Sequence, residues 1–542
     1  MNTAGQAASE EQESLMFWVG TLLQKSLVLF AGISTDLRFF TARTRNMFLV
    51  GFLKINLNLW TLMMLPGLLR LRTEAARLHW KTLCQHQLQQ IQDGARITAD
   101  ITPRLEGHWI STGCEVRAGP EFITRSYMFH PNGTFKAYQF YYTDHQCTRP
   151  GYTLVIKGRI QLRQASWVTH GATNADYQLH QVTVTFHSEQ AMASTLDKMN
   201  SSCSCPDCFG RAWSLQTTHE ILNARSGWDC TAGLGFAMHE LSLVRVEKQV
   251  HWQLVKELFL GDIHTSWAQR THHRPIGYQR PLQAALHHMH PCAACSIIYQ
   301  ADEHHPPILP TQQELGTHLG GQWASQVCEC RPAVLFLTRY LVFHASSNTW
   351  DGHYTHYSDP ACRRPTFLIR AWGRYSEGAP ATQVRGGTNF VFTTRQVWVT
   401  PLDVTTALLL NSSTTGSCGQ DGSWLPGLEQ DLSHTNGCLA LGIRLPHTEY
   451  ELVRIEWDQA SQRRLLLLGQ RPTDGSSPDA PSKQATSYQT PLLQCSKDAV
   501  GISKRVKQHQ QKETKSQGTT AWEGSHQARL ALLLVFTDLF LN

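Results

Sequence analysis

Two short stretches of this chain contain cysteines at a spacing that can bind a metal ion. They are Cys203-x-Cys205-x-x-Cys208, and Cys292-x-x-Cys295 preceded by His287, His288 and His290. Zinc favours tetrahedral sites of cysteine and histidine ligands at such spacing. Neither stretch has a clear second half, however, and fifteen cysteines in one chain are typical of disulfide-bonded proteins. We therefore interpret both stretches as disulfide cysteines, with zinc as the alternative, and expect no metal site and no cofactor.

Carboxylates near arginines form a second set of residues that could do chemistry. Glu115 and Glu329 each follow a cysteine, and Arg125 and Arg339 lie ten residues further along. A catalytic carboxylate beside an arginine would fit this pattern, but its occurrence twice favours a structural ion pair. The sequence lacks a phosphate-binding loop, a complete dinucleotide fingerprint, a zinc-protease helix and a nucleophile elbow. We expect that the chain is not an enzyme.

These residues belong to a pattern that runs through the chain twice. Trp109 recurs as Trp323 at an offset of 214 residues, and the same offset relates Phe129 to Phe343. Such a long period indicates duplication of a whole domain. The cysteines follow it: Cys114, Cys147, Cys208 and Cys230 correspond to Cys328, Cys362, Cys418 and Cys438. Cys292 and Cys495 each follow a shared Tyr-Gln-x-Pro-Leu motif and form a further pair of equivalents.

The cysteine count leaves the pairing open. Four cysteines per copy allow three connectivities, and the sequence does not choose among them. The odd total leaves at least one thiol free or intermolecular. Cys203, Cys205 and Cys330 have no counterpart in the other copy and are the candidates for unpaired thiols. A repeated cysteine framework indicates the secretory pathway.

The composition divides the chain into seven segments. They are an atypical N-terminal extension (1–75) with an apolar signal or anchor segment (47–69), a lead-in (76–100), the first repeat (101–282), a His/Cys/Pro linker (283–314), the second repeat (315–495), a disordered polar stalk (496–529) and an apolar C-terminal tail (530–542). The tail is short for a transmembrane helix and fits a glycolipid-anchor signal better. We expect membrane attachment, by a glycolipid anchor or a single span, or else secretion.

Within each repeat, apolar and polar residues alternate with a period of two. Leu154, Ile156 and Ile160 share one face of such a segment, for example. This alternation predicts half-buried antiparallel strands, and we expect short helices around 215–224 and 253–260. The predicted fold is mainly β, with two tandem homologous antiparallel β-barrel-like domains stapled by disulfides.

The glycosylation sequons and the net charge indicate where the protein resides and which partners it can bind. Asn132, Asn200 and Asn411 each begin an Asn-x-Ser/Thr sequence, so we expect a glycoprotein. The net charge is +6, and the basic residues form no stripe outside residues 497–515, which argues against nucleic-acid binding. The sequence leaves the oligomeric state open, a homo-oligomer included.

Aromatic residues are dense in both repeats and could line an apolar pocket. A small curled sheet can enclose one apolar ligand, such as an acyl chain, although ordinary core packing explains most aromatic residues. The candidate pocket residues are Phe122, Phe129, Phe135, Tyr138, Phe140, Phe336, Phe343 and Trp350.

Several longer motifs resemble one known family. The motifs are Ser111-Thr-Gly-Cys-Glu-Val-Arg117, Gly119-Pro-Glu-Phe-Ile-Thr-Arg125, Met238-His-Glu-Leu241, Glu257-Leu-Phe-Leu-Gly-Asp-Ile-His264, Asp302-Glu-His-His-Pro-Pro-Ile-Leu-Pro310, Thr435-Asn-Gly-Cys438 and Gly469-Gln-Arg-Pro-Thr-Asp-Gly-Ser-Ser-Pro-Asp479. They resemble the adenomatosis polyposis coli down-regulated 1 family over residues 80–495. The resemblance implies a cell-surface glycoprotein that inhibits Wnt signalling. It further implies that two barrel-like domains bind Wnt, through its acyl chain, and the lipoprotein-receptor-related co-receptor. The alternative is a structural or adhesion ectodomain that binds no lipid.

Overall fold

The computed structural model describes residues 84–496, except 94–96, 101, 201–212, 251–253, 286–291, 332–334, 414–415, 421 and 459–461. All of these described residues belong to one compact unit, Trp80–Asn542. The expected signal or anchor segment (47–69), the tail (530–542), nearly all of the stalk (496–529) and Cys203, Cys205 and Cys208 lie outside the described residues.

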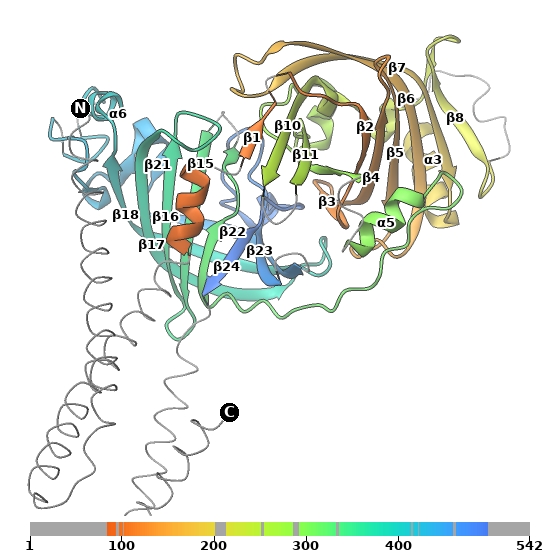
Figure 1. The fold of residues 1–542 in the computed structure, drawn as a ribbon. Helices are drawn as coiled ribbons and strands as arrows, with labels where there is room; N and C mark the ends of the chain where they lie inside the picture. The colour runs from red at the N-terminus through yellow and green to blue at the C-terminus, as the bar shows by residue number, and fades with distance from the viewer. Residues whose placement is uncertain are drawn as a thin grey trace, which may run out of the picture. The chain divides into compact units, whose positions relative to one another are not determined.

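The first repeat forms a closed eight-stranded antiparallel barrel, which we call the first barrel. Its strands are β2 (Gly107–Ile110), β4 (Glu121–Phe129), β5 (Thr134–Tyr142), β6 (Pro150–Ala165), β7 (Thr173–Phe186), β10 (Leu243–Val250), β11 (Leu254–Leu260) and β12 (Leu282–Ala284). They pair in this order, and β12 returns to β2. The strands β1 (Ile97–Ala99), β3 (Glu115–Arg117), β8 (Thr218–Asn223) and β9 (Trp228–Asp229) extend the sheet (Figure 1).

The second repeat repeats this topology, and we call its ring the second barrel. Its strands are β13 (Gly321–Ser325), β15 (Leu335–His344), β16 (Thr349–Tyr357), β17 (Pro365–Pro380), β18 (Thr388–Pro401), β22 (His447–Asp458), β23 (Arg463–Leu468) and β24 (Leu492–Ser496). The pairings run from β13 round to β24 and back to β13. Short strands accompany them: β14 (Glu329–Arg331), β19 (Gln430–Asp431), β20 (Gly437–Cys438) and β21 (Ile443–Arg444).

Helices occupy only a small part of the described chain. The α-helices are α3 (Glu189–Asn200), α5 (Ala293–Gln300), α6 (Val404–Asn411) and residues 84–93. The 3-10 turns are η2 (Ala232–Leu234), η3 (His239–Ser242), η4 (Trp267–His272), η6 (Ser433–Thr435), η7 (Leu439–Leu441) and η8 (Pro481–Lys483). The predicted fold class, mainly β with two homologous disulfide-stapled barrels, is confirmed.

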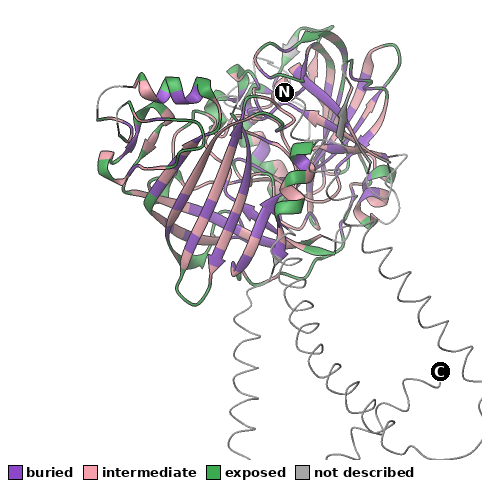
Figure 2. Cartoon of the chain, turned by 60° about the vertical axis from the view of Figure 1, so that its left-hand side comes forward, coloured by how far each residue is buried: buried purple, intermediate pink, exposed green. Residues whose placement is uncertain are grey.

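Buried and less buried residues follow one another along the strands of the sheets (Figure 2). In each barrel the indole Nε1–H of one fully buried tryptophan donates to a backbone oxygen at the same distance. Trp109 donates to Leu105 O and Trp323 to Leu319 O, both at 2.7 Å. Gly158 lies where the register between β6 and β7 shifts, and a Cβ there would stand 2.8 Å from the Phe135 ring. The duplicated sequence thus specifies duplicated core contacts.

The two expected helices are strands in the structure, so those two predictions are wrong. Residues 215–224 contain β8, which pairs with β7, and residues 253–260 contain β11, which pairs with β10. In β11 the apolar residues fall at 254, 255 and 258–260, a spacing that both periods accommodate. Pairing with β10 over seven residues decides in favour of the strand.

The disulfides confirm that some cysteines at corresponding positions of the two repeats form corresponding bonds. Cys114–Cys147 in the first repeat matches Cys328–Cys362 in the second. Cys418 pairs with Cys438, and Cys230 is disulfide-bonded as well. The expected equivalence of Cys292 and Cys495 is wrong. Cys292 bonds to Cys295, and Cys495 bonds to Cys84 in helix 84–93. Cys330, one of the three cysteines expected to be candidates for unpaired thiols, is a free thiol.

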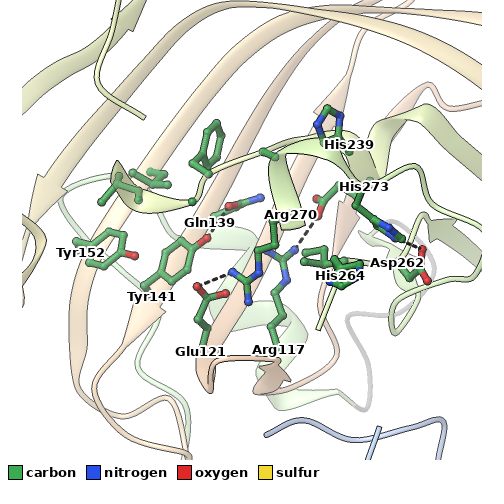
Figure 3. Close-up of a pocket in the computed structure, with 17 residues that line it drawn as sticks. Arg117, Glu121, Gln139, Tyr141, Tyr152, His239, Asp262, His264, Arg270 and His273 are labelled. Atoms are coloured by element: carbon green, nitrogen blue, oxygen red, sulfur yellow. Dashed lines mark hydrogen bonds and ion pairs between the residues drawn. The ribbon is translucent and has the colours of Figure 1, made fainter. Parts of the chain in front are cut away.

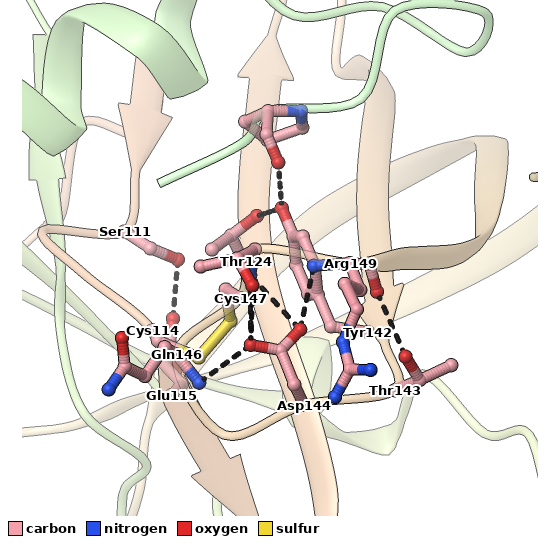
Figure 4. The surroundings of a disulfide bond; sticks show 12 residues. Ser111, Cys114, Glu115, Thr124, Tyr142, Thr143, Asp144, Gln146, Cys147 and Arg149 are labelled. Atoms are coloured by element: carbon pink, nitrogen blue, oxygen red, sulfur yellow. Dashed lines mark hydrogen bonds between the residues drawn. A yellow bond between two sulfur atoms is a disulfide. The ribbon is translucent and has the colours of Figure 1, made fainter. Parts of the chain in front are cut away.

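The Asp-x-x-Cys motif explains how Cys147 reaches its partner (Figure 4). Cys147 has a positive φ of 55°, which is uncommon for a residue with a Cβ. The Asp144 carboxylate accepts backbone N–H groups from Gln146, Thr148 and Arg149 around this turn. Burial raises the pKa of Asp144, but these hydrogen bonds outweigh it, so the pKa lies below its ordinary value. Asp359 holds Cys362, with a φ of 54°, in the same way.

Candidate functional site

The first barrel has a pocket at the end where β5 finishes and β6 begins. The space between its lining residues measures about 530 Å³, a figure that includes the open mouth of the pocket. The lining comes from β3–β6, the segment from η2 to η3, and the chain after β11. The lining residues are Arg117, Glu121, Gln139, Tyr141, Tyr152, Leu154, Leu234, Gly235, Phe236, Ala237, His239, Glu240, Asp262, Ile263, His264, Arg270 and His273 (Figure 3).

One wall of the pocket is apolar and aromatic. The rings of Tyr141 and Tyr152 are stacked, with centroids 4.6 Å apart and an interplanar angle of 13°. Leu154 belongs to the buried barrel core, and Leu234 and Phe236 pack against that core. Burial raises the pKa of both tyrosines, so their phenols are neutral at physiological pH. This wall offers hydrocarbon and aromatic faces to a ligand.

The other wall is built around a buried carboxylate. Arg117 donates to Glu240 at 3.0 Å, and Tyr127 and Gln279 also donate to this carboxylate. Burial raises the pKa of Glu240, but the Arg117 and Arg125 guanidiniums outweigh it and leave the pKa below its ordinary value. Glu240 is therefore ionised, and the Arg117 charge is neutralised within the pocket wall.

A second ion pair and a histidine complete the polar wall. Arg270 donates to Glu121 at 2.9 Å and also to the backbone oxygen of Ala118. His273 contacts Asp262 at 3.1 Å. Within the part of the chain that the structure describes, the Nε atoms of Arg117 and Arg270 are buried and have no hydrogen-bond partner. Buried donors normally find an acceptor, so these two stand out among the polar groups that line the pocket.

The eight predicted pocket residues do not come together in this pocket. Phe129 and Phe135 lie in the core of the first barrel, and Phe343 and Trp350 lie in that of the second. Phe122, Tyr138 and Phe140 lie in a different cluster, against α5, and Phe336 packs near helix 84–93. None of the eight lines the pocket. The strand alternation that placed Phe135 inside the barrel necessarily places Tyr138 and Phe140 on the other face.

The motifs that resemble the family contain seven of the lining residues, but no motif predicts that they form a pocket. The seven are Arg117, Glu121, His239, Glu240, Asp262, Ile263 and His264. The contact between Arg117 and Glu240, for example, joins residues that are 123 positions apart. The aromatic wall was missed because Tyr141 belongs to the same dense aromatic stretch as Tyr138 and Phe140, with no local signal that sets it apart.

The shared glutamates and arginines form the expected structural pairs. Arg125 contacts Glu115 at 2.7 Å, and Arg339 contacts Glu329 at 2.9 Å, with all four side chains buried. A serine hydroxyl donates to the glutamate in each pair, Ser111 in the first repeat and Ser325 in the second. These duplicated pairs join β3 to β4 in the first repeat and β14 to β15 in the second.

The three sequons differ in their surroundings. Asn132 is exposed, and its Oδ1 accepts from the Thr134 backbone N–H at 3.0 Å and hydroxyl at 2.7 Å. The Asn411 amide donates to Trp424 O and accepts from Trp424 N–H, both at 2.9 Å. Asn200 is the last residue of α3, and its side chain lies outside the described part.

Over the described ranges, no helix is both long and apolar enough to cross a membrane. The several disulfides fit an extracellular protein. The sequence model of one family, described as adenomatosis polyposis coli down-regulated 1, matches the chain twice, over residues 83–310 and 311–505. The two matches correspond to the two halves that carry the two barrels.

Proposed function

Because this chain belongs to the adenomatosis polyposis coli down-regulated 1 family, we propose that it is an extracellular cell-surface glycoprotein that negatively regulates Wnt signalling. It acts by binding Wnt and the lipoprotein-receptor-related co-receptor. The family match and the disulfide-stapled pair of barrels support this proposal.

The pocket of the first barrel is the proposed site for the Wnt acyl chain. The observation that supports this assignment is that the pocket combines an apolar wall with two buried N–H groups that have no acceptor among the described residues. Tyr152, Leu234 and Phe236 supply a surface for hydrocarbon. The Nε–H groups of Arg117 and Arg270 supply donors for the carbonyl oxygen of the acyl ester.

Binding measurements with the full-length chain test this proposal. We expect acylated Wnt to bind at least about tenfold more tightly than the same Wnt without its acyl chain, a difference of about 1.4 kcal/mol. The variant Leu234→Trp fills the pocket and should abolish that difference. Leu441→Trp is the matched control, because Leu441 also ends a 3-10 turn before a left-handed glycine, in the second barrel. Equal binding of the two Wnt forms by the unmodified protein would remove the acyl-chain mechanism.

A structural or adhesion ectodomain without lipid binding is the second candidate. It is favoured by the side-chain packing inside the barrels, where Tyr127, Trp323, Phe343 and Phe390 are almost completely buried. Such interiors leave no room for a long ligand except at an end. Binding of neither Wnt form, together with normal surface display of the protein, would support this candidate and remove the first.

A further inference from the structure

The disulfide between Cys292 and Cys295 differs from the others in what it connects. The other disulfides with assigned partners in the described residues join cysteines separated by 20 to 411 positions. Cys292 and Cys295 are three positions apart and belong to the start of one helix, α5. Disulfides stabilise mainly by restricting the unfolded chain, and this effect falls as the closed loop shortens. Among the disulfides with assigned partners in the described residues, this bond therefore contributes the least to folding, and it can open without releasing any element from another.

The two sulfur atoms have different surroundings. Cys292 is the N-cap of α5 and is partly exposed, whereas Cys295 is completely buried. The Sγ of Cys292 accepts the backbone N–H of Cys295 at 3.1 Å. A thiolate at Cys292 would keep this hydrogen bond and would also benefit from the positive end of the helix dipole. One sulfur is thus accessible and stabilised as an anion, and the other is shielded.

The outer surface beneath α5 is fixed by other bonds. Cys295 and Ile298 pack with Phe122, Phe140 and Cys147, and Cys147 is held by its own disulfide to Cys114. The Tyr142 hydroxyl donates to Pro307 O at 2.8 Å, which fastens the chain beyond α5 to β5. Opening the Cys292–Cys295 bond therefore leaves α5 attached at both its core face and its C-terminal side.

From these observations we propose that Cys292–Cys295 is a redox-active disulfide that undergoes thiol–disulfide exchange with extracellular thiols. This inference does not depend on Wnt binding. The chemical class of the co-reactant is a low-molecular-weight thiol such as glutathione, or a cysteine thiol of a partner protein.

The exchange takes place in two balanced steps. The attacking thiolate forms a bond to Cys292 Sγ, the Cys292–Cys295 bond breaks, and Cys295 leaves as a thiolate that takes up a proton. A second thiolate then attacks the sulfur that the first thiol contributed, which releases the oxidised thiol dimer and a Cys292 thiolate. Two thiols are oxidised to one disulfide, and the protein gains two thiol groups.

Differential alkylation of the full-length protein tests the proposal. Cys330, which is a free thiol, is first blocked with a light alkylating reagent. The protein is then equilibrated in glutathione buffers of increasing reducing strength, and newly formed thiols are labelled with a heavy reagent and located by peptide mass spectrometry. We expect Cys292 and Cys295 to be labelled in buffers at least about tenfold less reducing than those that open Cys114–Cys147, which is the internal control. Simultaneous opening of both disulfides would overturn the proposal.

Two single variants test which sulfur is attacked. Cys295→Ser leaves the partly exposed Cys292 thiol, and we expect it to form a mixed disulfide with oxidised glutathione. Cys292→Ser leaves the buried Cys295 thiol, and we expect about tenfold less of the adduct. The Cys114–Cys147 disulfide, mapped in the same digests, reports that each variant is folded. Absence of the adduct from a folded Cys295→Ser variant would contradict the assigned role of Cys292.

Discussion

Cys84 and Cys495 are joined by a disulfide across 411 positions of the chain. This bond attaches helix 84–93 to the end of β24. In the first repeat, α5 follows β12 along the chain and packs on Phe122, Tyr142 and Cys147. Helix 84–93 packs on the equivalent residues of the second repeat, Phe336, Tyr357 and Cys362 (Figure 1). The two barrels therefore carry a helix on the same outer surface, and for the second barrel a disulfide supplies the covalent connection that the peptide chain supplies in the first.

Removal of this disulfide should loosen the second barrel more than the first. The double variant Cys84→Ser/Cys495→Ser leaves no new free thiol, and its long closed loop predicts a loss of up to about 5 kcal/mol. Hydrogen exchange should show loss of protection in residues 84–93 and in β24, with α5 unchanged. Cys292→Ser/Cys295→Ser is the control, with an expected loss at least twofold smaller. Equal losses in the two double variants would contradict the role assigned to Cys84–Cys495.

The buried pair of Glu329 and Arg339 should be essential for stability. Glu329→Gln removes the buried carboxylate that both Arg339 and Arg331 contact, which costs about 3–5 kcal/mol. Chemical denaturation at pH 7 measures this cost. As a control, Asp176→Asn removes the exposed partner of Arg163 and should change stability by less than about 0.5 kcal/mol.

The effect of Glu329→Gln should also depend on pH. Burial raises the pKa of Glu329, but Arg339 and Arg331 outweigh it, so its folded-state pKa lies below the ordinary value. A lowered pKa contributes stability that is complete above the unfolded value of about 4.3 and is lost as the pH falls through the folded value. The difference between the variant and the unmodified protein should therefore shrink below about pH 4. A difference that stays constant down to pH 2 would show that the charge of Glu329 is not responsible.

The duplication allowed much of the fold to be predicted. Trp109 and Trp323, or Cys147 and Cys362, are specified by local motifs that form the same turns and strands in both copies. The pocket could not be predicted in this way, because Arg117, Glu240 and Arg270 meet only when distant segments close over one end of the barrel. The attachment of Cys84 to Cys495 was missed for a related reason, since Cys84 lies outside the repeated sequence and has no counterpart there.

The sequons should differ in glycan occupancy. Asn132 is exposed at a turn, so we expect a glycan there. Asn411 uses both atoms of its amide to hold Trp424, whose side chain is buried in the second barrel, so we expect it to be unmodified. Enzymatic release of the glycans in heavy-oxygen water labels each asparagine that carried a glycan. Peptide mapping by mass spectrometry then measures the occupied fraction at each of the two sites. Full occupancy at Asn411 in the secreted, folded protein would show that the Asn411–Trp424 contact is dispensable.

Two glutamates face each other in the first barrel, where Glu247 on β10 is directly opposite Glu257 on β11. Burial and the charge of Glu247 raise the pKa of Glu257 to about 7. A raised carboxyl pKa means that the folded protein binds more protons than the unfolded chain between about pH 4 and pH 7, so stability falls as the pH rises through this window. The second barrel has no such conflict at the equivalent place, because Leu465 is opposite Glu456.

Replacement of Glu257 should therefore stabilise the protein in neutral and basic solution. Glu257→Gln removes the like charge, keeps an acceptor for Gln283, and should gain up to about 3 kcal/mol at pH 8. The gain should vanish near pH 4, where Glu257 is protonated in both the folded and the unfolded chain. Thermal unfolding from pH 4 to pH 8 measures this, with Glu456→Gln as the matched variant, for which no gain is expected because its neighbour is Leu465. A Glu257→Gln variant that is no more stable than the unmodified protein at pH 8 would show that Glu247 and Glu257 do not oppose each other in the folded state.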